Sequence, residues 1–123
     1  MKPGASGFKR IVDATGYTAK GLRSAWRNES AFRQETILAA LLAPSAFWLG
    51  RSLPETALLL ATLAIVLTTE LLNSAIEAVV DRASPEFNEL AGRAKDMGSA
   101  AVFVSLASVV VVWSLIAFDR FVS

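Results

Sequence analysis

Residues 57–80 read Ala-Leu-Leu-Leu-Ala-Thr-Leu-Ala-Ile-Val-Leu-Thr-Thr-Glu-Leu-Leu-Asn-Ser-Ala-Ile-Glu-Ala-Val-Val, an apolar segment of 24 residues that contains Glu70 and Glu77. A helix of this length crosses a hydrocarbon core about 30 Å thick. Glu70 then lies about 20 Å from Ala57, roughly two turns below the far interface, and Glu77 lies at that interface. Because a charge inside a span is costly and is functional by default, the segment predicts a membrane helix that carries a site.

The polar side chains of this segment share one helical face. At about 100° per residue, Glu70, Asn73, Glu77 and Asp81 form one stripe on an otherwise apolar helix. Lipid does not tolerate such a stripe, so it must face protein, water or a substrate. The alternative is a packing network in which these carboxylates pair with Arg or Lys from neighbouring helices. For Asp81, which is followed by Arg82, we favour that alternative.

The composition agrees with a membrane protein. The 123 residues are enough for one domain, 54% of them are hydrophobic and 19% are charged, and a soluble domain of this size could not bury that much apolar surface. The chain has no Cys and no His, which excludes disulfides, thiolate metal sites and a histidine base. A bound metal must therefore be a hard ion held by oxygen, with Mg²⁺ the default.

The uncharged runs predict the layout. They cover residues 36–50, 56–69 and 97–118. With their flanks they indicate an all-α membrane protein of one domain, 1–123. Its expected parts are a surface helix region at 1–28, spans at 29–51, 55–82 and 97–120, and a cytoplasmic loop at 83–96.

The basic residues predict the orientation. Ten of the 12 Lys and Arg lie before residue 36 or in the second loop, and two lie in the other connection and at the C-terminal end. By the positive-inside rule, the amino terminus is cytoplasmic and the carboxyl terminus periplasmic in a multi-pass protein of the inner membrane. We expect no cleaved secretory signal, because the first apolar run comes too late. Trp48 and Trp113 fit an interfacial aromatic belt.

The amino-terminal third is too polar to span. On a helical wheel one face carries Leu22, Trp26, Glu29 and Arg33. A neighbouring stripe carries Lys20, Arg23 and Arg27. This pattern predicts a helix that lies on anionic headgroups and is interrupted around Gly16. A partly ordered basic tail is the alternative.

The second loop can accommodate a phosphate. Lys95 is predicted at the start of the third-span helix, where the helix dipole and free backbone amides also favour an anion. An ordinary pair of Lys95 with Asp96 at the membrane surface is the alternative. Gly16 and Gly21 have the spacing of a Walker A loop, but Leu22-Arg23 follows where Lys-Ser/Thr is required. Any use of ATP therefore lies outside the soluble kinase folds.

Four segments carry a resemblance. The runs 70–82 and 92–102 closely resemble the prokaryotic integral-membrane diacylglycerol kinase family, and residues 21–26 and 28–35 are similar to it as well. The likeness covers nearly the whole chain in order. It implies a homotrimer of three-span subunits, each with a surface helix, whose active sites are shared between neighbouring subunits at the cytoplasmic interface. Ala101, Ser105 and Ser108 would permit close helix approach in such a trimer, or are ordinary membrane-helix composition.

The resemblance also implies residue roles. Glu70 matches the catalytic base, Asn73 a residue needed beside it, and Glu29 and Glu77 the carboxylates that hold Mg²⁺ on the ATP phosphates. The implied nucleotide-binding residues are Arg10, Tyr17, Glu29, Glu77, Glu86, Asn88, Lys95 and Asp96. The implied lipid-substrate residues are Arg10, Ala14, Arg23, Trp26, Ala31, Arg33, Gln34, Glu35, Trp48, Glu70, Ser99 and Trp113.

The chain departs from the family in a few places. Asp13 stands where the best-known members carry a base, and Phe87-Asn88 replaces a Tyr-His pair beside the nucleotide region, so contacts from that ring and hydroxyl are not expected. Some relatives phosphorylate undecaprenol instead. The run 95–102, Lys-Asp-Met-Gly-Ser-Ala-Ala-Val, places this chain with the diacylglycerol branch.

The expected reaction is a direct in-line transfer from ATP to the primary hydroxyl of 1,2-diacylglycerol. It yields phosphatidic acid and serves phospholipid recycling. Without His or Cys, a covalent phosphoenzyme is not expected, and positioning with charge neutralisation suffices. No nucleic-acid partner is expected. Undecaprenol kinase is the nearest alternative, and the more remote ones are a small proton-coupled transporter and a purely structural membrane subunit.

Overall fold

The computed structural model describes residues 6–122 and is helical almost throughout. Its helices are α1 (Gly7–Asn28), α2 (Ser30–Leu49), α3 (Leu53–Ala83) and α4 (Glu89–Phe121). The all-α prediction is confirmed. Residues 1–5, with Lys2 among them, and residue 123 lie outside the described part, so the surface helix is described only from Gly7.

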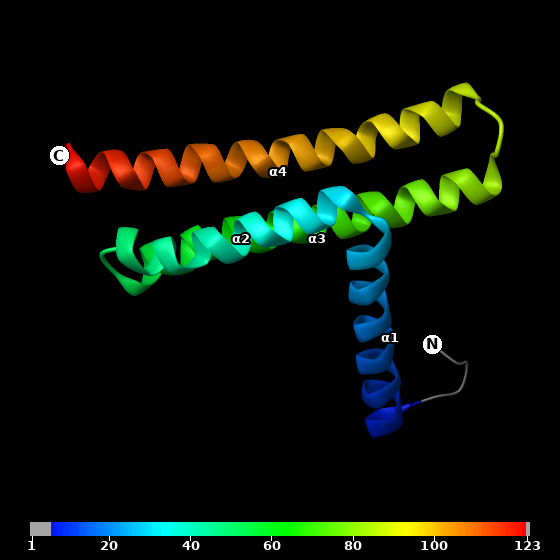
Figure 1. Cartoon of the computed structure of the whole chain (residues 1–123), viewed down its shortest axis with the longest axis horizontal. Coiled ribbons are helices and arrows are strands. Elements are labelled where there is room, and N and C mark those ends of the chain that lie inside the picture. Colours follow the sequence, from blue (N-terminus) through cyan, green and yellow to red (C-terminus); the bar gives the residue numbers. More distant parts are fainter. Residues whose placement is uncertain (1–5, 123) are drawn as a thin grey trace.

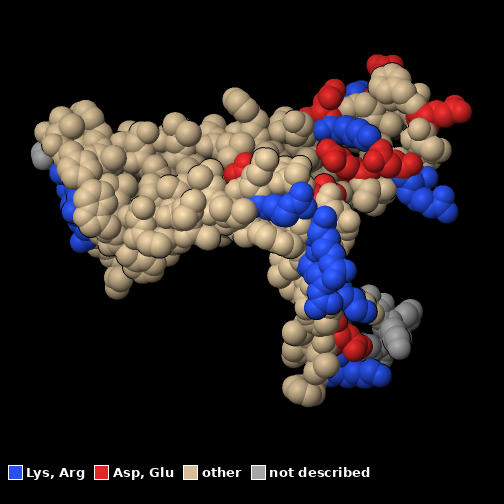
Figure 2. Space-filling model, viewed as in Figure 1, with Lys and Arg blue, Asp and Glu red and all other residues tan. Residues whose placement is uncertain are grey.

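The helices form a bundle with one projecting arm. Helices α3 and α4 run antiparallel along each other, and α2 packs beside α3, whereas α1 leaves the bundle at a steep angle (Figure 1). Two helices within residues 6–122, α3 and α4, are long and apolar enough to cross a membrane. On the face shown in Figure 2, the half of the bundle away from α1 is almost free of charge up to its end, where basic side chains gather.

Local signals set the ends of the two long helices. The Ser52 side chain accepts the N–H of Glu55 (3.3 Å), and Pro54 lies in the first turn of α3, so both features favour a helix start. The Asn88 Oδ1 accepts the N–H of Ala91 (2.8 Å) and caps α4 in the same way. Only residues 84–88 therefore separate α3 from α4, and the predicted loop 83–96 is wrong from Glu89 onward.

The surface helix also differs from its prediction. Helix α1 is continuous through Gly16, so the predicted interruption is wrong, and so is a partly ordered tail for residues 7–28. The helix ends at Asn28, and Glu29 alone separates it from α2. Glu29 has extended backbone angles (φ −119°, ψ 103°). Glu29 and Arg33 are therefore not on the same helix as Leu22 and Trp26, although the wheel placed them on one face.

The packed core lies toward the end of the bundle that carries the α2–α3 turn (residues 49–53), which we call the outer end. Ala46, Leu49, Leu59 and Ile116 form a buried cluster there. Hydrogen bonds also join α3 to α4: Trp113 Nε1 donates to Thr62 Oγ1 (3.0 Å), and Thr69 Oγ1 donates to Ser105 Oγ (2.9 Å). Ser105, only 3% exposed, therefore contributes to the contact between α3 and α4 within one chain.

Many large apolar side chains of the bundle face outward. Phe103 is 72% exposed, Leu41 68% and Val110 66%. A water-soluble surface does not tolerate so many exposed apolar side chains on three helices. The bundle surface fits lipid or further protein, in agreement with the composition.

Candidate active site

The predicted polar stripe runs along the half of α3 that leads to the α3–α4 turn. Glu70 is buried, with 5% of its surface exposed, Asn73 and Glu77 are half-buried, and Asp81 is exposed. The Asn73 Nδ2 donates to Glu77 Oε1 (3.4 Å). The stripe therefore passes from a buried carboxylate to a solvent-accessible one within three helical turns.

Three other carboxylates lie in the neighbourhood of Glu70. Glu77 from α3, Glu35 from α2 and Glu29 from the α1–α2 junction are all close enough to repel its negative charge. Within residues 6–122, no Lys or Arg side chain forms an ion pair with Glu70, Glu77 or Glu29. A structural network of paired charges therefore does not explain these three carboxylates in this part of the chain.

Glu29 occupies the bend between α1 and α2. It is the N-cap residue of α2, but its side chain makes no capping hydrogen bond, so the carboxylate is not used to hold the helix. The Arg33 Nη1 donates to the carbonyl oxygens of Trp26 (2.8 Å) and Arg27 (3.2 Å), which are free acceptors at the end of α1. The guanidinium of Arg33 therefore fixes the bend that presents Glu29, a use that the predicted lipid contact did not foresee.

A cavity lies in the angle between α1 and α3. Its volume is about 400 Å³, and Glu29 lines it together with Gly21 and Ala25 of α1 and Ser74 and Ala78 of α3. The α3 wall of this cavity is formed by residues beside the polar stripe and not by the stripe itself, although Glu29 is close enough to Glu70 to repel its negative charge. Small side chains on both helices leave the space open.

A second cavity of about 400 Å³ lies at the α3–α4 turn. Three predicted nucleotide residues, Glu86, Lys95 and Asp96, line it together with Asp81. Lys95 Nζ pairs with Asp81 Oδ1 at 2.6 Å. The favoured structural pairing of Asp81 is thus present, with Lys95 of α4 as the partner. The alternative pair of Lys95 with Asp96 is not formed within residues 6–122.

The helix-terminus argument for Lys95 is wrong. Because α4 begins at Glu89, Lys95 is its seventh residue, and the free amides lie nearly two turns away beside Asn88. The Asn88 side chain is engaged as the cap and with Ser84. Lys95 can still contribute its ammonium charge to an anion.

The remaining predicted residues do not converge within one chain. Arg10 and Tyr17 lie on exposed turns of α1. Trp48 and Trp113 lie toward the opposite end of the bundle from the turn: Arg120 stacks on the Trp48 ring (4.8 Å to the centroid), and Trp113 binds Thr62. The other predicted lipid-side residues, mostly exposed on α1, α2 and α4, are Ala14, Arg23, Trp26, Ala31, Gln34 and Ser99.

Sequence reasoning missed one residue of this site. Gly98 of α4 is buried directly against the Asn73 amide, and a Cβ built on Gly98 would lie 2.2 Å from Asn73 Oδ1. The sequence offered no signal for this contact, because Asn73 and Gly98 are 25 residues apart and meet only through the register of α3 against α4.

Comparisons with known proteins agree with one another. A family model described as prokaryotic diacylglycerol kinase matches residues 16–117. A protein of Escherichia coli (strain K12) named diacylglycerol kinase is 47% identical over 98% of this chain and 99% of its own length. Proteins of the same name from Pseudomonas aeruginosa and Helicobacter pylori are 51% and 42% identical, over 92% of this chain and 92% and 88% of theirs.

Proposed function

The chain belongs to the prokaryotic diacylglycerol kinase family and is a lipid kinase of the membrane, and we propose that it transfers the γ-phosphoryl group of ATP directly to the primary hydroxyl of diacylglycerol. The bond between the γ-phosphorus and its bridging oxygen breaks, and the products are phosphatidic acid and ADP. The site on α3 supports a direct transfer, because it offers carboxylates and a lysine but no His or Cys to carry a phosphoryl group.

The observation that carries this mechanism is the environment of Glu70. Its carboxylate is buried, is repelled by the negative charges of Glu35, Glu77 and Glu29, and forms no ion pair with a Lys or Arg of residues 6–122. A carboxylate held in this way keeps its lone pairs available to a proton donor. Glu70 accepts the proton of the lipid hydroxyl as that oxygen attacks the phosphorus.

Glu29 and Glu77 are suited to Mg²⁺. Both are carboxylates without a capping or ion-pair role, and the Asn73 hydrogen bond orients Glu77. Within the described residues no three acidic side chains lie close enough to hold a metal by themselves. Two carboxylates fit an ion that takes its other ligands from phosphate and water, as Mg²⁺ commonly does. When bound, the ion neutralises charge on the ATP phosphates.

The nucleotide enters from the cytoplasmic end. The cavity at the α3–α4 turn faces the most highly charged part of the bundle, where Lys, Arg, Asp and Glu gather (Figure 2). Lys95 supplies a positive charge to the phosphates there, either beside Asp81 or after leaving it. Diacylglycerol reaches Glu70 sideways along the exposed apolar surface of the bundle.

The membrane arrangement is part of the proposal. We place α2 beside α3 and α4 as a third span, with the amino terminus cytoplasmic in the inner membrane. Three such chains form a trimer that shares its active sites. Exposed apolar side chains on the bundle support this assembly, and so does the failure of Arg10 and Tyr17 to meet the α3–α4 turn within one chain.

The Glu70→Gln variant tests the mechanism. We expect ATP-dependent labelling of diacylglycerol in mixed micelles to fall by a factor of roughly 10³, because the amide cannot accept the proton. Glu89→Gln is the matched control: Glu89 is exposed in the first turn of α4 and outside the site, so its loss should matter little. Activity of Glu70→Gln equal to that of the control would exclude Glu70 as the base.

The acceptor and the assembly have separate tests. Diacylglycerol should be labelled faster than undecaprenol when both are offered side by side, and the reverse would reassign the acceptor.

Co-expression of a Glu70→Gln chain with an Arg10→Glu chain should restore activity that each variant lacks alone, because mixed trimers contain complete sites. A mixture as inactive as its components would show that each site is built by one chain.

A further inference from the structure

Helices α3 and α4 come into unusually close contact at Gly98. The three atoms nearest to a Cβ built on Gly98 all belong to Asn73: Oδ1 at 2.2 Å, Cγ at 3.3 Å and Cα at 3.9 Å. Real Cβ atoms do not tolerate the first of these distances. The Asn73 carbonyl oxygen therefore occupies space that is open only because residue 98 has no side chain.

The position of this oxygen sets the orientation of the whole amide. Asn73 Oδ1 is buried and accepts no hydrogen bond from residues 6–122, while the amino group at the other end donates to Glu77 Oε1. An amide is planar, so turning the oxygen toward α4 turns the amino group toward α3 and its carboxylates. One end of the rigid Asn73 amide therefore contacts Gly98, and the other end donates to Glu77.

We propose that Gly98 is a positioning residue for the phosphoryl transfer: by leaving room for Asn73 Oδ1, it holds the Asn73 amino group on Glu77 and fixes the direction of that carboxylate. The Glu77 oxygen that does not face Asn73 is then left for a cation or for water. This inference rests on the proposed function for its kinetic consequence, but the geometry of the amide can be measured without it.

Alanine at position 98 should disturb the reaction and leave lipid binding intact. A methyl group there must push Asn73 Oδ1 aside and rotate the amide, which takes the amino group off Glu77. We expect kcat to fall roughly a hundredfold, since misplacement of a positioning group by about 1 Å has effects of that size. The Mg²⁺ concentration for half-maximal activity should rise, while KM for diacylglycerol stays the same.

A double-mutant cycle separates this role from general helix packing. Once Asn73 is replaced by alanine, the nearest known atom is the Cα of residue 73 at 3.9 Å, an ordinary contact, so the methyl group of Gly98→Ala fits. Gly98→Ala should therefore change the residual activity of Asn73→Ala by less than about twofold. Gly16→Ala is the matched control, because nothing lies within 4 Å of a Cβ at Gly16 and its helix should tolerate the methyl.

Nuclear magnetic resonance gives a readout without nucleotide or metal. The chain has three asparagines, Asn28, Asn73 and Asn88, so selective ¹⁵N labelling yields three side-chain amide pairs. In wild-type protein in micelles, Glu77→Gln should shift the Asn73 pair and leave the other two unchanged. In the Gly98→Ala background, Glu77→Gln should not shift the Asn73 side-chain amide signals.

Each result decides the proposal. The proposal is overturned if Gly98→Ala leaves kcat unchanged. It is also overturned if Gly98→Ala lowers activity as much in the Asn73→Ala background as in wild-type protein, or if Glu77→Gln shifts the Asn73 amide signals as much in the Gly98→Ala background as in wild-type protein. If Gly98→Ala alone fails to fold, the double variant Asn73→Ala with Gly98→Ala must fold, and its failure would also overturn the proposal. Wild-type protein that labels no diacylglycerol would instead refute the proposed function, and the amide measurement would still test the geometry.

Discussion

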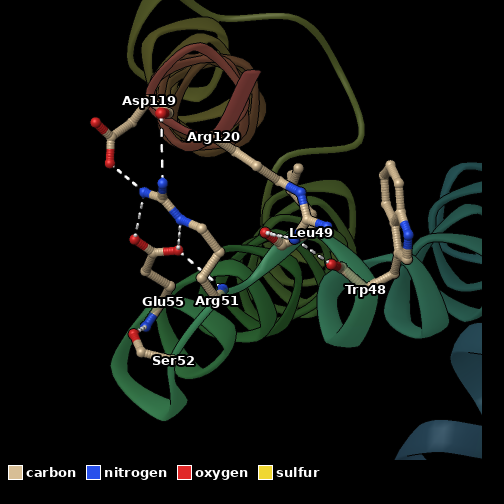
Figure 3. Close-up of polar contacts among 7 residues, drawn as sticks. All are labelled: Trp48, Leu49, Arg51, Ser52, Glu55, Asp119 and Arg120. Carbon is tan, nitrogen blue, oxygen red and sulfur yellow. Dashed lines mark hydrogen bonds and ion pairs between the residues drawn. The ribbon is translucent and has the colours of Figure 1, made fainter. Parts of the chain in front are cut away.

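The two ends of the bundle differ in whether their charged side chains have partners. At the outer end, Arg51 donates to Glu55 (3.0 Å from its N–H and 3.2 Å from Nη2) and pairs with Asp119, while Arg120 donates to the carbonyl oxygens of Trp48 (2.7 Å) and Leu49 (3.1 Å) (Figure 3). In the other half, Glu70, Glu77 and Glu29 gather without a Lys or Arg partner in residues 6–122.

This difference distinguishes charges that hold the fold from charges that we propose serve the chemistry. The outer group ties the α2–α3 turn and the end of α2 to the end of α4, and every partner lies within one chain (Figure 3). Buried like charges without partners destabilise a protein, so they are retained only where another component completes them. The same residue type should therefore respond to substitution differently at the two ends.

Replacing one carboxylate at each end by its amide should give the largest contrast. Glu77→Gln should lower kinase activity roughly a hundredfold or more, because it removes charge that stabilises the transferring group, and it should not lower the midpoint of thermal unfolding. Glu55→Gln should keep activity within about twofold, as surface substitutions commonly do. Activity assays and unfolding curves of both variants check this, and equal activity losses would contradict the division.

Arg33→Gln should have an intermediate effect that identifies what this arginine does. Without its hydrogen bonds to Trp26 and Arg27, the bend that presents Glu29 loosens, and we expect KM for Mg-ATP to rise about tenfold, equivalent to about 1.4 kcal/mol. Measuring KM for Mg-ATP and for diacylglycerol separately distinguishes a loosened bend from a lost contact with the lipid. A rise in KM for diacylglycerol alone would show that the sequence-based assignment to the lipid side is the better one.

Arg120→Met should weaken the fold and spare the reaction. Arg120 supplies donors to two carbonyl oxygens at the end of α2, and losing charge-assisted bonds of this kind costs about 1 kcal/mol or somewhat more. The free energy of unfolding in detergent measures the loss. A fall in kcat at a temperature where the variant remains folded would mean that the outer end is coupled to the site.

Arg51→Met should have the smallest effect, and one that depends on salt. The side-chain hydrogen bond to Glu55, followed by that to Asp119, raises the pKa of Arg51 above its ordinary value. A raised pKa in a cation gives stability that is lost only as pH rises through that value, so the pairs should persist through ordinary alkaline conditions. Because Arg51 is exposed, we expect a small drop in thermal midpoint at low salt that vanishes at high salt.

The sequence predicted the polar stripe because it depends on one helix alone. The positions of Glu70, Asn73, Glu77 and Asp81 follow from 3.6 residues per turn. The structure places all four on α3, with Glu70 buried, the middle two half-buried and Asp81 exposed. The helix starts were harder. Charged residues at 89–96 suggested a loop, but Asn88 caps a helix there, because capping depends on a few local contacts and not on hydropathy.

The composition and periodicity of this chain determined that it is an all-α membrane protein with carboxylates along one face of a long apolar helix, because burial of apolar surface and helix geometry are properties of the chain itself. Only the tertiary structure decided which groups meet: Glu29 and Glu35 near Glu70, Lys95 on Asp81, Arg33 across the α1–α2 bend, and Gly98 against Asn73. Those contacts depend on the register and angle between helices, which no single helix encodes.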